Sequence, residues 1–132
     1  MNKLWGIIII GVTLLLASCD TEDSDNGNLD GFWQMTSSPG ITWAFQGHIL
    51  ELRDVKKVHQ DIVMSFTREG EKLKLSDPYR VDRDSDDVAL QNADLLIPYG
   101  ISDTTTEFYI SELTSSRMVL DNSASHLEFR KY

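Results

Sequence analysis

Residues 62–75 have the sequence IVMSFTREGEKLKL, which carries the clearest structural signal in this chain. Apolar side chains occupy every second position in two runs: Ile62, Met64 and Phe66, then Leu73 and Leu75. A period of two is typical of a β-strand that buries one face. Glu69-Gly70 lies between the runs and is typical of a tight turn. The stretch therefore predicts an antiparallel hairpin.

The same alternation recurs in the rest of the chain. Further apolar pairs are Phe108 and Ile110, Met118 and Leu120, and Leu127 and Phe129. Gln46-Gly47 and Asp121-Asn122-Ser123 supply turns beside other apolar runs. From Leu29 onward no segment keeps the i, i+3, i+4, i+7 spacing of an amphipathic helix. We expect an all-β domain of short strands, arranged as a sandwich or a closed barrel.

Residues 76–94 break this pattern. Pro78 and the charged run at 82–87 interrupt the alternation, so we expect a long loop with an irregular strand. The apolar segment Leu95-Leu96-Ile97 follows and ends at Pro98. No internal repeat and no second domain is visible in the sequence.

A short apolar run precedes the single cysteine of the chain. Lys3 gives the run a positive start, and residues 4–16 are too few to span about 30 Å of hydrocarbon as a helix. Leu16-Ala17-Ser18-Cys19 then places two small residues before the cysteine. The arrangement resembles the signal peptide of bacterial lipoproteins, and this implies a helical segment 1–18 that is removed and acyl chains on Cys19. An ordinary secretory signal that leaves a free thiol is the alternative.

Residues 20–28 contain four carboxylates and no apolar side chain. We expect residues 19–28 to be a disordered acidic tether, followed by one domain at 29–132. An acidic run behind the cysteine resembles the signal that sends Bacteroidetes-type lipoproteins to the outer face of the outer membrane. A solvated spacer is the alternative. The expected location is the bacterial outer membrane, with the acyl chains as the membrane contact.

The chain is acidic, with 21 Asp and Glu against 12 Lys and Arg and a net charge of −9 at pH 7. Nucleic-acid binding needs clustered Lys and Arg against the phosphates, so the composition argues against a nucleic-acid partner. The domain expected at 29–132 is large enough to fold without a disulfide or a metal. The single cysteine of the chain cannot form an intramolecular disulfide.

Leu29-Asp30-Gly31-Phe32-Trp33 opens the first expected strand with a Gly-x-Trp motif. The motif resembles the start of lipocalins, and residues 108–132 look like the closing strands of the small lipocalin-like lipoproteins of Bacteroidetes. The resemblance spans nearly the whole mature chain. It implies an antiparallel up-and-down β-barrel of about eight strands.

In that family, a basic residue of the last strand covers the tryptophan of the first strand at the closed end of the barrel. By position, the resemblance implies this closure for Gly31, Trp33 and Arg130. Lys131 is the alternative, because the alternation places Arg130 on the outer face. A cation over the indole ring contributes about 0.5–2 kcal/mol.

An eight-stranded barrel is either filled by its own side chains or holds one small ligand. The inward positions predicted here are bulky, so a packed interior and a shallow pocket at one mouth are both open. The candidates for lining such a pocket are aromatic residues near strand ends and loops: Trp43, Phe45, Tyr79, Tyr99 and Tyr109. Rings with a polar edge suit an amphipathic or ring-shaped ligand, and the alternative for each is a place in the core.

Candidate metal and catalytic residues are sparse. The histidines are His48, His59 and His126. No metal-ligand spacing connects them. Asp82, Asp84 and Asp86 match the start of a calcium loop, but Asp87 and Ala93 stand where a glycine and a glutamate are required. We expect no metal and no cofactor, and no nucleophile or phosphate-binding motif occurs in the sequence.

Together these features predict a non-catalytic, membrane-anchored lipocalin-like protein that binds a small hydrophobic or amphipathic ligand at the barrel mouth. The alternative is an accessory subunit with a packed barrel, which docks an envelope protein through its outer surface or through residues 82–94. An unrecognised hydrolase is a third hypothesis.

Overall fold

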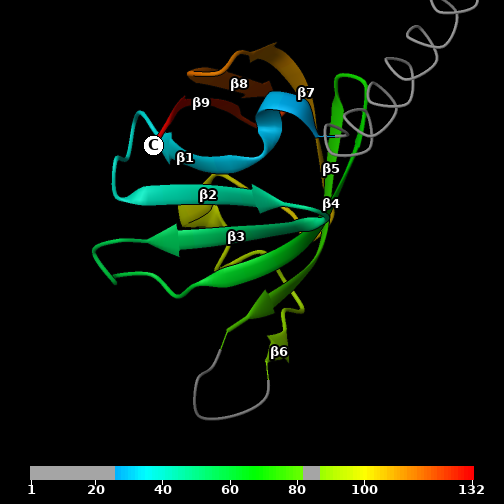
Figure 1. The fold of residues 1–132 in the computed structure, drawn as a ribbon. Coiled ribbons are helices and arrows are strands. Elements are labelled where there is room, and N and C mark those ends of the chain that lie inside the picture. The colour runs from blue at the N-terminus through cyan, green and yellow to red at the C-terminus, as the bar shows by residue number, and fades with distance from the viewer. Residues whose placement is uncertain (1–25, 82–86) are drawn as a thin grey trace, which may run out of the picture.

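The computed structural model describes residues 26–81 and 87–132 (Figure 1). The expected signal segment, Cys19 and the aspartates Asp82, Asp84 and Asp86 lie outside the described residues. The described strands are β1 Gly31–Met35, β2 Ile41–Gln46, β3 Ile49–Asp54, β4 Ile62–Glu69, β5 Lys72–Arg80, β6 Val88–Ala89, β7 Thr106–Leu113, β8 Arg117–Asp121 and β9 His126–Lys131. Two 3₁₀ helices accompany them, η1 Gly27–Leu29 and η2 Ile97–Tyr99.

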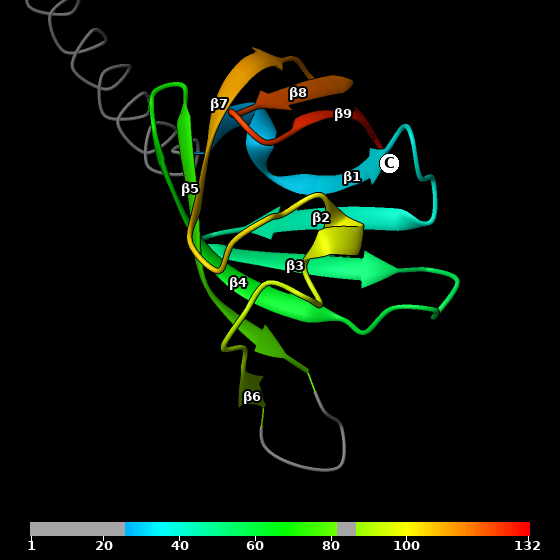
Figure 2. The ribbon, with the colours of Figure 1, turned by 180° about the vertical axis from the view of Figure 1, so that it is seen from behind.

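Eight of the described strands close into an antiparallel barrel (Figures 1 and 2). Strands β1 to β5 pair in sequence order, and β7, β8 and β9 continue from β5. The barrel closes where β9 returns to β1, with Lys131 opposite Trp33. The two-residue β6 pairs only with the end of β5, at Tyr79 and Arg80. The predictions of an all-β fold and of an up-and-down barrel of about eight strands are confirmed.

The hairpin predicted from residues 62–75 is formed by β4 and β5. Arg68 pairs with Leu73 and Glu69 with Lys72 on the two sides of the turn. Gly70 has a φ of 60°, a conformation that glycine adopts without the steric cost of a side chain. The hairpin between β2 and β3 uses Gly47 in the same way, with a φ of 63°.

The long irregular segment begins later than the sequence suggests. Strand β5 continues through Pro78 to Arg80, so the first part of the segment expected to be a long loop with an irregular strand belongs to a long strand. The pairing with β4 shifts register between Val63 and Ser65, opposite this part of β5. Such an irregularity accommodates a proline, which lacks the N–H that a regular ladder requires.

Residues 26–28, which the sequence assigns to the tether, contact the barrel. The Asn26 side chain donates to the backbone oxygen of Gly47 at 2.9 Å, and Arg68 Nη1 donates to the Asn26 backbone oxygen at 2.7 Å. Leu29 is fully buried directly afterwards. The ordered domain therefore includes Asn26, because polar contacts hold a segment that has no apolar side chain of its own.

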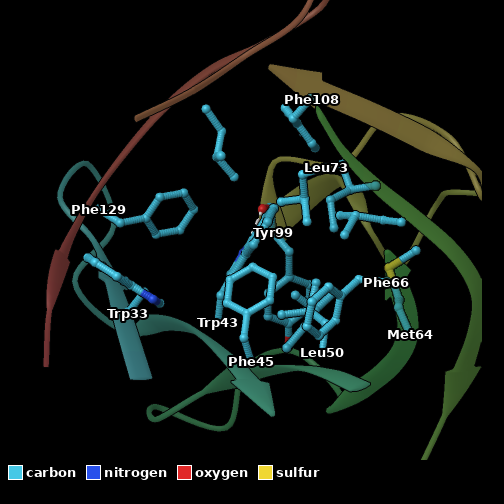
Figure 3. Packing of buried hydrophobic residues seen from close by; sticks show 14 of the residues in the cluster. Trp33, Trp43, Phe45, Leu50, Met64, Phe66, Leu73, Tyr99, Phe108 and Phe129 are labelled. Carbon is cyan, nitrogen blue, oxygen red and sulfur yellow. Dashed lines mark hydrogen bonds between the residues drawn. The ribbon is translucent and has the colours of Figure 1, made fainter. Parts of the chain in front are cut away.

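The barrel interior holds one cluster of buried side chains (Figure 3). Trp43 is central to its aromatic part, with ring centroids 4.9 Å from Phe129 and 6.1 Å from both Phe45 and Phe108. Phe45 meets Phe66 edge to face at 5.0 Å. Tilted and edge-to-face arrangements of this kind are the favourable geometries for aromatic pairs.

Candidate functional site

Tyr99 enters the barrel interior from η2, in the connection between β6 and β7, and it is fully buried. Trp43 Nε1 donates to the backbone oxygen of Tyr99 at 3.2 Å, and the Tyr99 hydroxyl donates to the backbone oxygen of Gln60 at 2.6 Å. Burial, and then the nearby carboxylates of Asp61 and Asp54, raise the pKa of Tyr99, so the phenol stays neutral and remains a donor. These contacts fix the Tyr99 ring in the barrel interior beside Trp43, and we call this buried ring the plug.

Asp54, the last residue of β3, organises the loop at residues 55–60, which contains the Gln60 partner of Tyr99. Its buried carboxylate accepts the backbone N–H groups of Lys56 at 2.9 Å, Val58 at 3.2 Å and His59 at 3.1 Å. Burial alone would raise the pKa of Asp54, but these hydrogen bonds and the nearby His59 bring it below its usual value. The carboxylate therefore shapes the loop that supplies the Gln60 partner of Tyr99.

At the opposite, closed end, Lys131 covers Trp33. The Lys131 Nζ lies 4.4 Å from the centre of the Trp33 ring and donates to the backbone oxygens of Asn28 and Asp30. The assignment of this closure to Arg130 is therefore wrong. Because side chains alternate along β9, Lys131 points inward, whereas Arg130 is exposed opposite Gln34.

Gly31 makes the room that this lysine requires. Its φ is 120°, and a Cβ at this position would lie 2.8 Å from Lys131 Nζ. Trp33 Nε1 in turn donates to the backbone oxygen of Leu29 at 2.8 Å. The Gly-x-Trp motif thus joins the first and last strands to the segment that enters the barrel.

The five aromatic residues proposed as a pocket lining occupy different environments. Trp43, Phe45 and Tyr99 belong to the core. Tyr79 and Tyr109 are exposed, and the Tyr109 hydroxyl contacts Glu71 on the outside. Within the described ranges, the structure does not gather the five around one hollow.

Two hollows instead lie side by side on the outer face of β1, β2 and β3. The larger has a volume of about 640 Å³, and its lining includes Asp30, Gly31, Phe32, Ala44, Glu51 and Arg53. The smaller has a volume of about 300 Å³ and is lined by Phe32, Thr42, Arg53, Val55 and Tyr132. Because the two share Phe32 and Arg53, we call them together the outer groove.

Strand register explains the outer groove. Outward-facing Phe32 pairs with Ala44, which pairs with Glu51, so a methyl group separates a large ring from a long side chain. In the next outward row Thr42 pairs with Gln34 and Arg53. This groove is not predicted from the sequence, although the alternation already places an aromatic residue, Phe32, on the outer face.

A family model for the lipocalin-like domain matches residues 14–132. The chain belongs to the lipocalin-like domain family. The resemblance to this family is therefore confirmed, and it is a family of generally non-catalytic binding proteins.

Two solved structures resemble this lipocalin-like domain. A lipocalin-like protein from Bacteroides uniformis has a TM-score of 0.59 at 15% identity, over 80% of this chain and 100% of its own. An uncharacterized protein from Bacteroides eggerthii has a TM-score of 0.51 at 14% identity, over 78% of this chain and 98% of its own. At these identities the likeness shows the fold alone. No curated protein matches the sequence.

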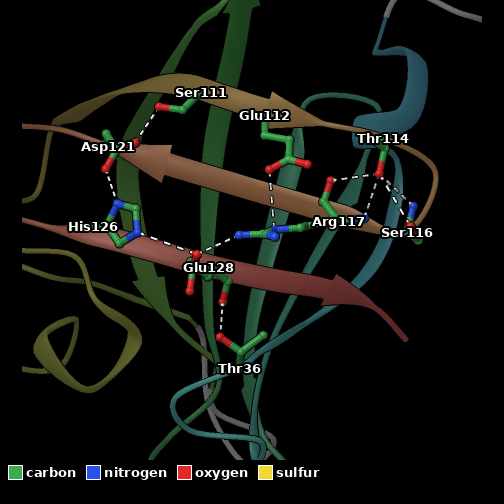
Figure 4. Close-up of polar contacts among 9 residues, drawn as sticks. All are labelled: Thr36, Ser111, Glu112, Thr114, Ser116, Arg117, Asp121, His126 and Glu128. Carbon is green, nitrogen blue, oxygen red and sulfur yellow. Dashed lines mark hydrogen bonds and ion pairs between the residues drawn. The ribbon is translucent and has the colours of Figure 1, made fainter.

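The lipocalin-like domain also carries a polar cluster on the outer face of β7, β8 and β9 (Figure 4). Asp121 accepts hydrogen bonds from Ser111 and His126, and Nε2 of His126 lies 3.7 Å from Glu128. Arg117 bridges Glu128 at 2.7 Å and Glu112 at 3.4 Å. The cluster joins the three strands through side chains.

This cluster contains a serine, a histidine and an aspartate but not the geometry of a catalytic triad. Ser111 and His126 both contact Asp121, whereas a nucleophilic serine must donate to the histidine that serves as its base. The hydrogen bond from Ser111, and then the one from His126, lower the pKa of Asp121. The hydrogen bond that His126 donates to Asp121 is the main cause of the raised pKa of His126.

Within residues 26–81 and 87–132, no group of three His, Cys, Asp or Glu side chains could hold a metal ion. In the same residues, no helix has both the length and the apolar character needed to cross a membrane.

The lipocalin-like domain presents two outer surfaces with different chemistry: the partly apolar outer groove on β1–β3 and the polar cluster on β7–β9.

Proposed function

We propose that this protein is a non-catalytic binding protein, anchored to the bacterial outer membrane by acyl chains on Cys19, that captures a small hydrophobic or amphipathic ligand. The ligand would lie in the outer groove instead of inside the barrel. Two observations carry this proposal: the described interior side chains pack around Trp43 and Tyr99, which a hydrogen bond joins, and a hollow lies on the outer face of the barrel.

The interior offers poor access to a ligand. Tyr99 would have to leave two hydrogen bonds and a fully buried position before a molecule could enter beside Trp43. Burial of a large aromatic ring stabilises a protein by about 3–5 kcal/mol relative to its loss, so this opening is costly. The outer groove requires no such rearrangement, and its volumes of about 640 and 300 Å³ fall within the range of ligand sites.

The anchor fits the position at which the chain enters the barrel. Asn26 is held at the closed end by Gly47 and Arg68, and Cys19 precedes it by seven positions. At about 3.5 Å per residue, the connection reaches at most about 25 Å. Acyl chains on Cys19 would therefore hold the closed end close to the membrane, and two or more chains would make the attachment stable.

A second candidate function is docking of an envelope protein on the same outer face. Phe32, Ile49, Val55 and Tyr132 are exposed apolar side chains on or beside β1–β3. A group of neighbouring exposed apolar side chains is typical of an interaction site. This is the observation that favours a macromolecular partner.

The test is native mass spectrometry of the full protein extracted from membranes. We expect a small-molecule adduct that the Phe32→Ser variant loses. Tyr109→Ser is the matched control, because Phe32 and Tyr109 are both 52% exposed and lie on different faces of the barrel. An adduct that survives Phe32→Ser contradicts the outer groove as the site. A stoichiometric protein partner without an adduct would favour the second candidate.

A further inference from the structure

We infer that the smaller hollow of the outer groove, with Phe32 and Tyr132 on its walls and Thr42 in its lining, is a site for an aromatic carboxylate. This inference rests on the proposed function and specifies the chemical class of its ligand.

Thr42 is the first observation. It lies on the outer face of β2 but is only 5% exposed, and its Oγ1 has no hydrogen-bond partner in the described part of the chain. A buried hydroxyl without a partner destabilises the folded state, whereas a valine would fill the same space without this cost. Thr42 lines the smaller hollow, so a local shift of the side chains around it would bring this unpaired hydroxyl to a polar atom that comes from outside the chain.

The walls of the smaller hollow suit a flat ring. Phe32 is 52% exposed and Tyr132 is 75% exposed, and the Tyr132 N–H donates to the Phe32 backbone oxygen at 2.9 Å. This backbone contact keeps the two aromatic residues next to each other. Val55, 57% exposed, adds an aliphatic surface to the same hollow. Aromatic and aliphatic walls favour a ring over a flexible polar molecule.

Arg53 determines the preferred charge of the ligand. One of its terminal nitrogens, Nη2, lies 2.6 Å from Glu51, and the guanidinium has five N–H donors in total. This ion pair engages one terminal nitrogen of the guanidinium and leaves the N–H donors of the other nitrogens for a ligand. A guanidinium binds carboxylates through paired hydrogen bonds, and the Thr42 hydroxyl adds a further donor. A ring that carries a carboxylate uses both.

Glu51 already occupies part of Arg53, so a ligand carboxylate has to share the guanidinium with it. We therefore expect modest affinity in the wild type. Glu51→Gln would remove the competing charge and should tighten binding of an aromatic carboxylate several-fold. A gain of affinity cannot be explained by a loss of folding.

The experiment measures binding of 2-naphthoate, 2-naphthylmethylamine and 2-naphthylmethanol to the full protein in phosphatidylcholine nanodiscs, with empty nanodiscs as the blank. We expect the carboxylate to bind more tightly than the amine. Arg53→Gln should weaken 2-naphthoate about tenfold and change the affinity for the alcohol less than twofold. Tyr109→Ser should change neither.

Thr42 provides the sharpest pair of variants. Thr42→Val should weaken 2-naphthoate about fivefold while the thermal midpoint rises, and Thr42→Ser should keep the affinity because it keeps the hydroxyl. Equal binding of carboxylate and amine would overturn the inference. Unchanged affinity for 2-naphthoate in Thr42→Val and Arg53→Gln would also overturn it, because the Thr42 hydroxyl would then bind only water.

Failure of this inference is distinguishable from failure of the proposed function. If 2-naphthoate does not bind but the extracted protein carries another adduct that depends on Phe32, the outer groove stands and the ligand class is wrong. If no adduct depends on Phe32 either, both proposals are wrong.

Discussion

The ammonium group of Lys131 lies 4.4 Å from the centre of the Trp33 ring, so the last strand of the barrel covers the first. The contact joins residues that are far apart in the chain and also pair across β1 and β9. It makes the closed end a single unit, because the same ammonium binds the backbone of the segment that enters β1.

Lys131→Met should lower the free energy of unfolding by about 1–2 kcal/mol, because it removes the cation–π contact and the hydrogen bonds to two backbone oxygens. The measurement is urea unfolding followed by tryptophan fluorescence. Arg130→Met is the matched control, since Arg130 is exposed on the outer face, and it should change stability by less than about 0.5 kcal/mol. Equal losses in the two variants would contradict the assignment of the closure to Lys131.

Gly100→Ala should destabilise the protein more than Gly47→Ala. Both glycines have positive φ, 86° and 63°, which costs about 1 kcal/mol for alanine. At Gly100 an added Cβ would also lie 2.7 Å from Leu127 Cδ2, whereas nothing lies within 4 Å at Gly47. Overpacking of this kind costs a further ~1–2 kcal/mol. Thermal unfolding of the two variants measures the difference, and equal midpoints would mean that η2 is not held against β9.

The pKa of His126 should lie above its ordinary value of about 6.5, because the hydrogen bond that the ring donates to the Asp121 carboxylate favours the imidazolium. The stabilisation that His126 contributes is complete below the pKa that the histidine has in the unfolded chain. It is lost as the pH rises through the raised pKa of the folded state. Asp121 has a lowered pKa in the folded state. The stabilisation that it contributes is therefore present above the unfolded pKa of about 3.9 and is lost as the pH falls through the lowered pKa of the folded state.

The pair should therefore contribute most between about pH 4 and 6.5. The measurement is an NMR titration of the His126 ring in the wild type and in Asp121→Asn. The midpoint should fall in the variant, and the stability difference between wild type and His126→Gln should shrink from pH 5.5 to pH 8.5. An unchanged midpoint in Asp121→Asn would show that another group shifts the histidine.

Cys19→Ser should abolish incorporation of an alkyne-labelled palmitate in growing cells and leave the precursor unprocessed, because the thiol is the expected acceptor of lipid. Ser24→Ala, which leaves the residues up to Cys19 unchanged, should be labelled as the wild type is. Labelling that persists in Cys19→Ser would contradict the lipid anchor.

The strands could be predicted from the sequence because their signal is local. Alternation in residues 62–75 reports one buried face without knowledge of any distant residue, and β4 and β5 form there. The same alternation favoured Lys131 for the closure, and the match by position to the family led to Arg130 instead. The inward–outward alternation along the strand was therefore correct, and the match by position to the family was not.

The plug and the outer groove depend on contacts that no local pattern encodes. Tyr99 lies in a connection without periodicity, so its burial beside Trp43 follows from the tertiary path of residues 87–105. The outer groove exists because Phe32, Ala44 and Glu51 become neighbours through the registers of two strand pairs. Register is set by turns and by the whole inner face, so single positions do not reveal it.

The most direct test of binding on the outside is methyl NMR of the full protein with the ligand that it carries from membranes. We predict nuclear Overhauser effects from the ligand to the methyl groups of Ala44, Thr42 and Val55, which line the outer groove. Effects to the interior methyl groups of Met64, Met118 and Leu120 instead would place the ligand inside the barrel and contradict this account.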